Sequence, residues 1–303
     1  MNLMNAYSYS PLAVLGKQQQ SVKLGNVLKA AKEQLSICNI DEPTLLSEYI
    51  IAHTLQCQRL ELYACNEKLL SAAKICDIQN RIERLKKGEP LQYILGSTCF
   101  FEHNYKTDRR ALIPRPETET LVETAVNYDD LWHMPHPCIV DVGTGCGCIV
   151  ISMVLARPQA EYIATDISKK ALSLAKENAQ LYNVSEQIKF ICCDLLSKVA
   201  LASADAVISN PPYVSATDRE NLPRHIREHE PAIALDGGND GLKIIKRLIY
   251  QAFNTLKPQG FLFMEIGSDQ RQDVQYLLKQ TGFHDIKISH DLSGKDRVVC
   301  AKK

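Results

Sequence analysis

Four consecutive residues in the second half of the chain have the types needed to hold a planar amino group. Asn210, Pro211, Pro212 and Tyr213 follow the apolar run Ala206–Ile208 almost directly. Two consecutive prolines fix φ and prevent the chain from continuing as a strand or a helix. We therefore expect a rigid turn at the carboxyl end of a buried strand, which is the edge where ligands bind in an open α/β sheet.

The tetrad offers hydrogen-bond acceptors rather than a nucleophile or a base. The side-chain oxygen of Asn210 and the carbonyl of Pro211 are both acceptors, and two fixed acceptors suit the two hydrogens of a planar –NH2 group. Tyr213 adds a flat face, and the same acceptors stabilise charge that builds on the nitrogen as it is alkylated. The tetrad thus predicts methyl transfer from S-adenosylmethionine, leaving S-adenosylhomocysteine, to an amide or exocyclic amino nitrogen, with catalysis mainly by positioning.

A glycine-rich segment upstream predicts the cofactor site. It comprises Gly143, Thr144, Gly145, Cys146 and Gly147. The glycines permit a tight turn and a close approach of backbone to ligand. The segment is not the dinucleotide fingerprint, because the position of the third glycine is occupied by a cysteine.

An acid follows this segment at the end of the next predicted strand. Asp166 stands where a carboxylate can bind ribose hydroxyls. Together, the glycines and Asp166 indicate a nucleotide-like cofactor; the alternative is a tight turn followed by a helix-capping acid. Polar residues end four successive predicted strands (Asp141, Asp166, Asp194 and Asn210), which favours a cleft at one sheet edge, although each alone would be ordinary turn chemistry.

The elements that position these residues alternate between strand and helix from Cys138 onward, which predicts an α/β fold with a doubly wound, mostly parallel sheet. The last two strands, His284–Ser289 and Arg297–Ala301, are expected to form an antiparallel hairpin at the sheet edge. The charged segment Ser215–Pro231 is predicted to be a long loop, either solvated surface or a lid over the site.

The first third of the chain has helical periodicity. Residues 21–88 are predicted to form a small helical bundle of three helices suited to contacting a partner or substrate, with the third helix at Leu69–Leu85 and His53 half-buried on an apolar face. Residues 89–113, rich in aromatics and β-formers, predict a linking β-hairpin. Residues 114–303 form the predicted catalytic domain, and residues 1–20 are expected to be a flexible tail without a secretory signal.

Composition narrows the function classes. The 35 basic and 35 acidic residues give a net charge of +0, which weighs against binding nucleic acid mainly by surface charge. The 11 cysteines, an odd number, fit a reducing cytoplasm and match no common zinc spacing. His225 and His229 lack the remainder of an HExxH motif. No apolar run reaches the roughly 18 residues of a membrane span. From these cysteine and histidine spacings and the lack of a span, we expect a cytoplasmic protein without a metal site or a membrane segment.

The sequence resembles the HemK/PrmC family of release-factor glutamine methyltransferases. NPPY alone is shared with DNA and RNA amino-methyltransferases, but its combination with the motifs IPRPETE and LDGGNDGL is highly specific. The resemblance runs from about Gly88 to the C-terminus and is carried by Glu89–Gly96, Leu112–Glu119, Asp141–Gly147, Asn210–Tyr213, Ala234–Leu242, Glu265–Gly267 and Asp296–Val299.

The resemblance implies a class I methyltransferase fold with a seven-stranded sheet and methylation of N5 of the glutamine in the Gly-Gly-Gln motif of class I peptide chain release factors. It also implies that Gly143–Gly147 hold the methionine end of the cofactor and that Asp166 takes the ribose hydroxyls. Asp194 and Leu195 would lie along the adenine, and Asn210 would touch both cofactor and glutamine. Cys146, where the family usually has a small residue such as Ser, and Leu195, where some relatives have an aromatic, depart from the pattern.

Two alternatives stay open from the residues alone. A nucleic-acid amino-methyltransferase would need a target-recognition domain and a basic groove, and neither is indicated. A non-catalytic module that retains the fold is disfavoured by the intact Asn210 and glycine loop.

Arg115, held between two prolines, is either a pre-organised functional group or a surface charge. We expect a monomer.

Overall fold

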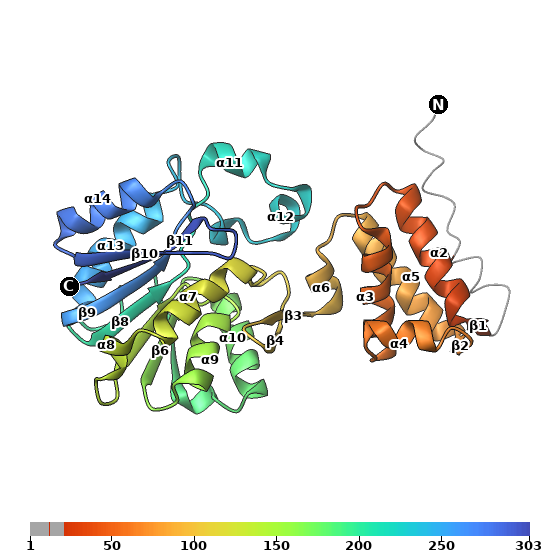
Figure 1. Ribbon diagram of the computed structural model, residues 1–303, viewed down its shortest axis with the longest axis horizontal. Coiled ribbons are helices and arrows are strands. Elements are labelled where there is room, and N and C mark those ends of the chain that lie inside the picture. Colours follow the sequence, from red (N-terminus) through yellow and green to blue (C-terminus); the bar gives the residue numbers. More distant parts are fainter. Residues whose placement is uncertain (1–11, 13–20) are drawn as a thin grey trace. The chain divides into compact units, whose positions relative to one another are not determined.

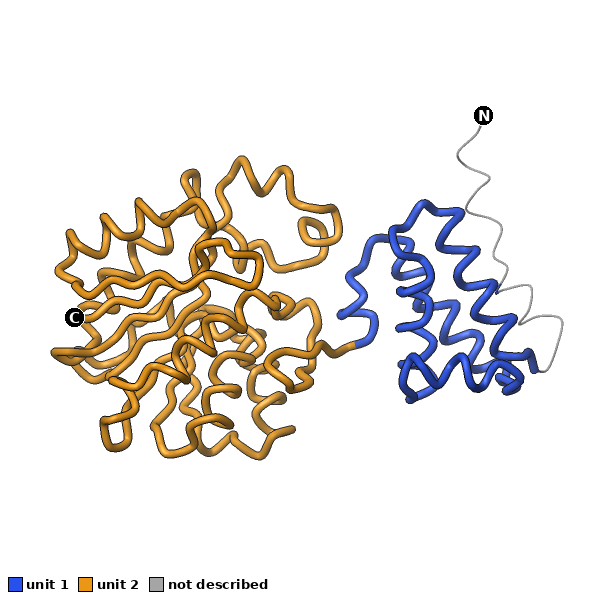
Figure 2. The backbone as a smooth tube through the Cα atoms, viewed as in Figure 1, with its two compact units in different colours: residues 1–95 blue, residues 96–303 orange. Residues whose placement is uncertain are grey.

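The computed structural model describes Leu12 and residues 21–303, so the predicted tail lies, apart from Leu12, outside the described residues. The chain divides into two compact units, residues 1–95 and residues 96–303 (Figure 2). The division falls inside the segment 89–113 that the sequence predicts as a linker. Each unit is described by itself.

The first unit is a helical bundle with a short two-stranded sheet. Its core is formed by fully buried aliphatic residues such as Leu35, Ile50 and Ile78. Pro43 begins one helix, where its missing N–H costs nothing. The elements are β1 (Ser21–Lys23), α2 (Leu24–Ile37), α3 (Pro43–Leu55), α4 (Arg59–Ala64), β2 (Leu69–Ser71), α5 (Ala72–Lys86) and α6 (Leu91–Leu95).

Two expectations for this unit are wrong. The third predicted helix begins at Ala72 rather than Leu69, because Leu69–Ser71 pairs antiparallel with Ser21–Lys23 as β2. His53 is exposed rather than half-buried, and its Nδ1 lies 3.3 Å from Arg81 Nη1. Partial desolvation of the ring and the charge of Arg81 lower the pKa of His53.

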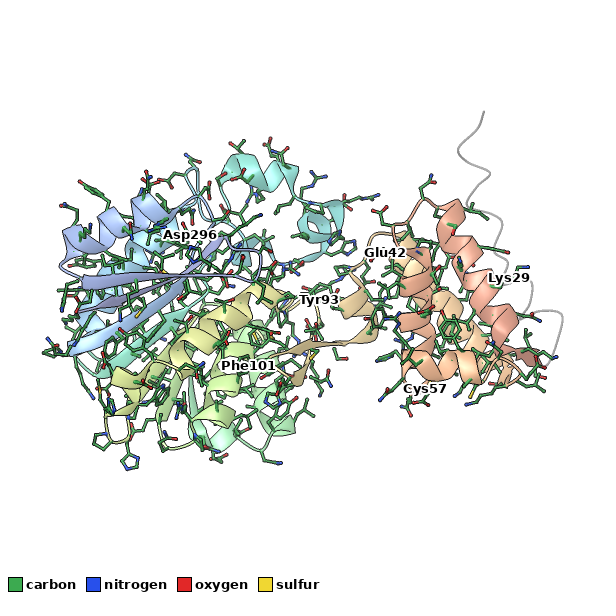
Figure 3. The ribbon with its side chains drawn as sticks, in the orientation of Figure 1. Lys29, Glu42, Cys57, Tyr93, Phe101 and Asp296 are labelled. Carbon is green, nitrogen blue, oxygen red and sulfur yellow. The ribbon has the colours of Figure 1, made fainter. Side chains whose placement is uncertain are left out.

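The predicted hairpin over residues 89–113 is shorter than expected. Its first part is the helix α6, because Pro90 starts a helical turn and its carbonyl accepts a hydrogen bond from the amide of Ile94. The hairpin proper is β3 (Ser97–Phe100) and β4 (His103–Lys106). Phe101 and Glu102 between them both have positive φ, as a two-residue hairpin turn of type I′ requires. Figure 3 marks Tyr93 on α6 and Phe101 in this turn.

The second unit contains the predicted seven-stranded sheet, in the order β10-β11-β9-β8-β5-β6-β7. The five strands from β9 to β7 are parallel, and β11 is antiparallel to both its neighbours. The last two strands do pair antiparallel, but the final strand is inserted inside the sheet and β10 is the edge. The strands are β5 (Cys138–Val142), β6 (Glu161–Asp166), β7 (Ile188–Cys192), β8 (Ala204–Ser209), β9 (Leu256–Glu265), β10 (His284–His290) and β11 (Asp296–Lys302).

Helices cover both faces of this sheet (Figure 1). Alternate strand residues explain the two layers: Ile139 packs into the core on one face, and Val140 into the core on the other. The first face is covered by α7 (Pro116–Val126), α9 (Cys148–Ala156) and α10 (Lys169–Leu181), and the second by α13 (Lys243–Thr255) and α14 (Arg271–Thr281). The chain leaves β5 in one direction for β6 and β7 and returns on its other side as β8. This reversal of strand order opens a crevice at the carboxyl ends of β5 and β8.

The segment predicted as a long loop, Ser215–Pro231, instead contains two short helices, α11 (Ala216–Asn221) and α12 (Arg224–His229). The Ser215 hydroxyl caps α11 by accepting a hydrogen bond from the amide of Asp218. Neither helix has a buried residue, so the charge pattern that favours a loop also fits these exposed helices. The minor elements of this unit are α8 (Asp129–Trp132) and the 3₁₀ turns η2 (Ser185–Gln187) and η3 (Ala232–Ala234).

Candidate functional site

A cavity of about 260 Å³ lies at the carboxyl edge of the parallel strands. Residues that end or follow four strands contribute to it: Gly143 and Gly145 after β5, Asp166 on β6, Asp194 after β7 and Asn210 after β8. The remaining walls are Arg110, Ala111, Leu112, Ile167, Ser168, Ala171, Leu195, Pro212, Pro231, Ile233, Ala234, Ile244 and Arg247. The structure thus brings three of the four predicted edge residues together with the glycine loop.

Two glycines of the loop line the cavity. Gly143 and Gly145 have φ of 73° and 58°, and no atom lies within 4 Å of a Cβ built on Gly143. A backbone of this kind can be approached closely by a ligand. Gly147 serves packing instead, because its Cβ would come within 3.0 Å of Ile151 Cδ1 and 3.1 Å of Ala175 Cβ.

The other two loop residues support the turn from beneath. Thr144 is buried, and its hydroxyl donates a 2.6 Å hydrogen bond to Asp141 Oδ2. Cys146 is 1% exposed, and its carbonyl accepts a 2.8 Å hydrogen bond from Asn178 Nδ2. Thr144, Cys146 and Gly147, all predicted as cofactor-binding, therefore lie outside the cavity lining.

Asp141 is also beneath the loop rather than at the cavity. It is 1% exposed, and its Oδ1 has no hydrogen-bond partner. Burial raises the pKa of this carboxyl to about 7, although the bond from Thr144 favours the ionised form. The fourth predicted edge residue is thus a buried support for the glycine loop.

Asp166 joins the loop to β6 and lines the cavity. Its Oδ2 accepts the amide of Gly145 at 2.9 Å, and its Oδ1 accepts the amide of Ser168 at 2.8 Å. Burial raises the pKa of the carboxyl, while these two amides lower it. Each carboxylate oxygen keeps a further lone pair, so Asp166 can accept hydrogen bonds from a pair of hydroxyls.

The far wall of the cavity is apolar with one ion pair. Arg247 Nη2 lies 2.5 Å from Asp194 Oδ2. Leu195 has φ of 49°, which is uncommon for a residue with a branched side chain. Ile167 lines the cavity and is 53% exposed, and Ile244 lies nearby in the same wall. These surfaces suit a flat heteroaromatic ring with polar edges.

The tetrad is split between the cavity and the interior. Asn210 and Pro212 line the cavity, whereas Pro211 is buried and Tyr213 lies outside the lining. The Tyr213 hydroxyl donates a 3.0 Å hydrogen bond to Glu265 Oε1, and burial raises the pKa of this phenol. Asn210 Nδ2 donates at 3.0 Å to the hydroxyl of Thr118, a residue of α7.

Thr118, Glu265 and Arg247 are site residues that the motifs alone do not identify. The first two do belong to the segments Leu112–Glu119 and Glu265–Gly267 that carry the family resemblance. Their role depends on tertiary contacts spanning 92 residues for Thr118 and 52 for Glu265, which sequence spacing does not encode. Arg247 carries no motif signal, and only its packing beside Asp194 identifies it.

Comparison with known proteins places both units in one family. The family described as the PrmC N-terminal domain matches residues 26–96, and the one described as the methyltransferase small domain matches residues 128–239. The chain is 33% identical over 283 residues to the release factor glutamine methyltransferase of Nitratidesulfovibrio vulgaris, covering 92% of this chain and 95% of the relative. The chain belongs to the release factor glutamine methyltransferase family.

Other members of the release factor glutamine methyltransferase family also match most of the chain. The protein of Thermodesulfovibrio yellowstonii is 35% identical over 257 residues, covering 85% of this chain and 91% of its own. Among solved structures, the hMettl16 catalytic domain, in complex with the MAT2A 3′UTR hairpin 6, aligns with a TM-score of 0.52 at 16% identity. That alignment covers 78% of this chain and 85% of the other, and it shows a shared fold.

The described residues, 12 and 21–303, contain no group of three or more His, Cys, Asp or Glu side chains placed to hold a metal ion. Within the same residues, every helix is too short or too polar to cross a membrane.

Proposed function

We propose that this protein methylates the side-chain amide nitrogen of the glutamine in the Gly-Gly-Gln motif of class I peptide chain release factors. Two facts support the proposal together. The chain matches release factor glutamine methyltransferases across both units. Its own cavity also joins a ligand-accessible glycine turn to the side chain of Asn210. The presence of Asn210 in the same cavity as Asp166 and Gly143 is the observation that carries the proposal.

The residues of this cavity fit S-adenosylmethionine. Asp166 offers acceptors for two ribose hydroxyls, and the open backbone at Gly143 and Gly145 suits the amino-acid end of the cofactor. Leu195, with Asp194, provides an apolar and a polar surface for the adenine. When bound, S-adenosylmethionine supplies an electrophilic methyl group on a positively charged sulfur.

The tetrad then acts on the substrate amide by orientation. Asn210 Oδ1 and the Pro211 carbonyl accept the two N–H hydrogens, which fixes the plane of the glutamine amide. With both hydrogens held, the nitrogen lone pair is presented to one side. The acceptors also stabilise positive charge that develops on the nitrogen. Tyr213, anchored through its hydroxyl to Glu265, supports the turn that carries both acceptors. Catalysis of this kind is mainly positioning, which contributes up to roughly 7–11 kcal/mol in well-oriented systems.

A methyl-transfer assay tests this function. Purified protein and S-adenosylmethionine with a radiolabelled methyl group are incubated with a class I release factor, the same factor carrying Gly-Gly-Ala, DNA or RNA. We expect label only in the Gly-Gly-Gln factor. Label in nucleic acid but not in the release factor would overturn the proposal, and label in neither substrate would favour a non-catalytic module.

The helical residues 21–88 are proposed to contact the release factor outside its Gly-Gly-Gln loop. If they do, a short Gly-Gly-Gln peptide will have a much higher KM than the intact factor.

The protein is also proposed to act as a monomer in the cytoplasm. Sedimentation equilibrium should give the mass of a single chain, and a dimer mass would contradict the monomer.

A further inference from the structure

The turn that carries the tetrad is held by one buried side chain, that of Gln270. This residue is 8% exposed and directly precedes α14, which begins at Arg271. Its Nε2 donates to the carbonyl oxygen of Tyr213 at 3.1 Å and to that of Gly241 at 3.3 Å. Its Oε1 accepts the amide of Gly267 at 2.9 Å. Gln270 therefore joins three segments that are distant in sequence.

The partners of Gln270 determine the orientation of its side-chain amide. The backbone N–H of Gly267 can only donate, so it must face Oε1. The carbonyls of Tyr213 and Gly241 can only accept, so they take the two hydrogens on Nε2. A flipped amide would leave all three backbone groups without these partners. The hydrogen that reaches the Tyr213 carbonyl thus comes from an amide with one allowed orientation.

Two glycines give Gln270 room to reach the turn. A Cβ built on Gly241 would collide with the carbonyl oxygen of Tyr213 and lie 2.6 Å from Gln270 Nε2. A Cβ built on Gly267 would lie 3.1 Å from Gln270 Cδ, so the side chain folds back over this glycine. Both glycines belong to segments that carry the family resemblance. Their closeness to Gln270 gives each of them a physical role.

Tyr213 is fixed through both its main chain and its side chain. Its hydroxyl donates to Glu265 Oε1 at 3.0 Å, and its carbonyl accepts from Gln270. The amide of the next residue, Val214, donates to the carbonyl of Leu235 at 3.1 Å. These contacts hold the end of the turn in one position.

The two prolines transmit this position along the tetrad. Pro211 and Pro212 each lock φ, so few free dihedral angles separate Tyr213 from Asn210. At the start of the turn, Asn210 directly follows β8 and donates a 3.0 Å hydrogen bond to the hydroxyl of Thr118. A displacement of the Tyr213 main chain is therefore passed to the Pro211 carbonyl rather than absorbed within the turn.

We propose that Gln270 is a positioning residue for methyl transfer, which fixes the acceptors of the tetrad through the main chain of Tyr213. The inference rests on the proposed function, because these acceptors are the ones assigned to the substrate amide. Gln270 is not among the residues that line the cavity. It therefore acts on the acceptors and not on the cofactor.

The test compares Gln270→Met with Gln272→Met in the full chain. Methionine is close to glutamine in length but has no N–H to donate, and Gln272 is an exposed residue on α14. We expect Gln270→Met to lower kcat for methyl transfer to a release factor by about 10- to 100-fold, because misplacing reacting groups by about 1 Å costs on the order of 100-fold. Gln272→Met should keep the native kcat. Calorimetric titration should give the native Kd for S-adenosylhomocysteine in both variants.

The contact itself is measured at the Tyr213 carbonyl. Tyr213–Val214 is the only Tyr–Val pair in the sequence, so protein labelled with ¹³C at tyrosine carbonyls and ¹⁵N at valine amides gives one correlated NMR signal. Loss of a hydrogen bond shields a carbonyl carbon, so this signal should move upfield in Gln270→Met and stay in place in Gln272→Met. An unmoved signal or a native kcat in Gln270→Met would overturn the inference, as would a rise in cofactor Kd equal to the loss of kcat.

A second variant separates the Tyr213 contact from the Gly267 contact. Gln270→Glu keeps an oxygen for the amide of Gly267, but its ionised carboxylate has no hydrogen for the Tyr213 carbonyl. Thermal unfolding is recorded to confirm that the variant is folded, and we expect an upfield carbonyl signal together with a loss of kcat like that of Gln270→Met. A native kcat alongside the upfield signal would show that the Tyr213 contact does not position the acceptors. If the native protein does not methylate a release factor, the proposed function fails instead, and the carbonyl signal still tests the contact.

Discussion

Arg115 Nη2 lies 2.5 Å from Oε1 of Glu230, whose side chain is fully buried although that of Arg115 is 30% exposed. The other carboxylate oxygen of Glu230 accepts the amide of Ile113 at 3.1 Å. The segment before α7 is therefore tied to the residue that follows α12. Arg115 is more than a surface charge, because it is the cationic partner of a buried acid beside Pro231, which lines the cavity.

The two members of this pair should differ in their effect on stability. Arg115→Ala leaves the buried carboxylate of Glu230 without its cation, so we expect the free energy of unfolding to fall by about 2–3 kcal/mol. This loss is smaller than that for breaking a fully buried ion pair, because Arg115 is partly exposed. Glu230→Gln removes the charge but keeps an acceptor for Ile113, and should cost less. Urea unfolding measures both.

A matched control lies on α12. Arg224 pairs with Glu228 at 2.9 Å, with side chains 69% and 40% exposed. Arg224→Ala should change the free energy of unfolding by no more than about 0.5 kcal/mol. If Arg224→Ala lowered the free energy of unfolding as much as Arg115→Ala does, the burial of Glu230 would not determine the size of the loss.

Asp166→Ala should mainly weaken cofactor binding. The carboxylate is the proposed acceptor of the ribose hydroxyls, and hydrogen bonds to a charged group contribute about 1.5–3 kcal/mol, which corresponds to a rise in Kd of roughly 10- to 100-fold. Calorimetric titration with S-adenosylhomocysteine gives Kd. Glu161→Ala, at the exposed opposite end of the same strand, is the control and should leave Kd unchanged. A fall in kcat with unchanged cofactor KM would contradict the ribose assignment.

The sequence predicts the sheet of this protein well for a physical reason. Strands such as Ile188–Cys192 and Cys138–Val142 are mostly apolar segments bounded by turn residues, and these local signals are enough to fix their limits. Elements that depend on partners are harder to predict. Leu69–Ser71 continues a helical pattern, yet becomes a strand because Ser21–Lys23 lies beside it. The order of the last two strands likewise depends on tertiary pairing.

The residues of the candidate site also fall into two groups, those that the local sequence predicts and those whose placement depends on tertiary neighbours. Gly143, Gly145 and Asp166 are recognisable because strand ends and glycines determine their positions along the chain. Whether a loop residue faces the ligand or the core is decided by neighbours such as Ala175, which packs under Gly147. For the same reason Cys146, next in sequence to the cavity-lining Gly145, lies buried with its carbonyl hydrogen-bonded to Asn178 of α10.

Asn210→Ala should abolish turnover while cofactor affinity falls much less. The substitution removes one of the two proposed acceptors for the substrate amide, whereas Asp166 and the glycine loop still hold the cofactor. Single-turnover methyl transfer and calorimetric titration give the two quantities separately. Asn221→Ala, exposed at the end of α11, should alter neither. Equal losses of rate and affinity in Asn210→Ala would make this residue a cofactor ligand only.

The buried carboxyl of Asp141 should give the cofactor-free protein a pH-dependent stability. Its pKa is raised from 3.8 to about 7 in the folded protein, chiefly by burial. Below the unfolded pKa the carboxyl is protonated in both states. As the pH rises, the unfolded chain ionises first, and folded stability falls progressively until the pH has passed the folded pKa. The total loss is about 4 kcal/mol for a shift of this size.

Asp141→Asn removes this titration and keeps an acceptor for Thr144. We therefore expect urea unfolding to show a smaller loss of stability between pH 4 and pH 8.5 in Asp141→Asn than in the native protein. Asp218→Asn, at an exposed position on α11, serves as the control and should follow the native protein at every pH. Since Asp141→Asn differs from the native protein in the Asp141 carboxyl alone, the contributions of the other titrating groups cancel in that comparison. Parallel curves for Asp141→Asn and the native protein would show that Asp141 is ionised in the folded state throughout this range.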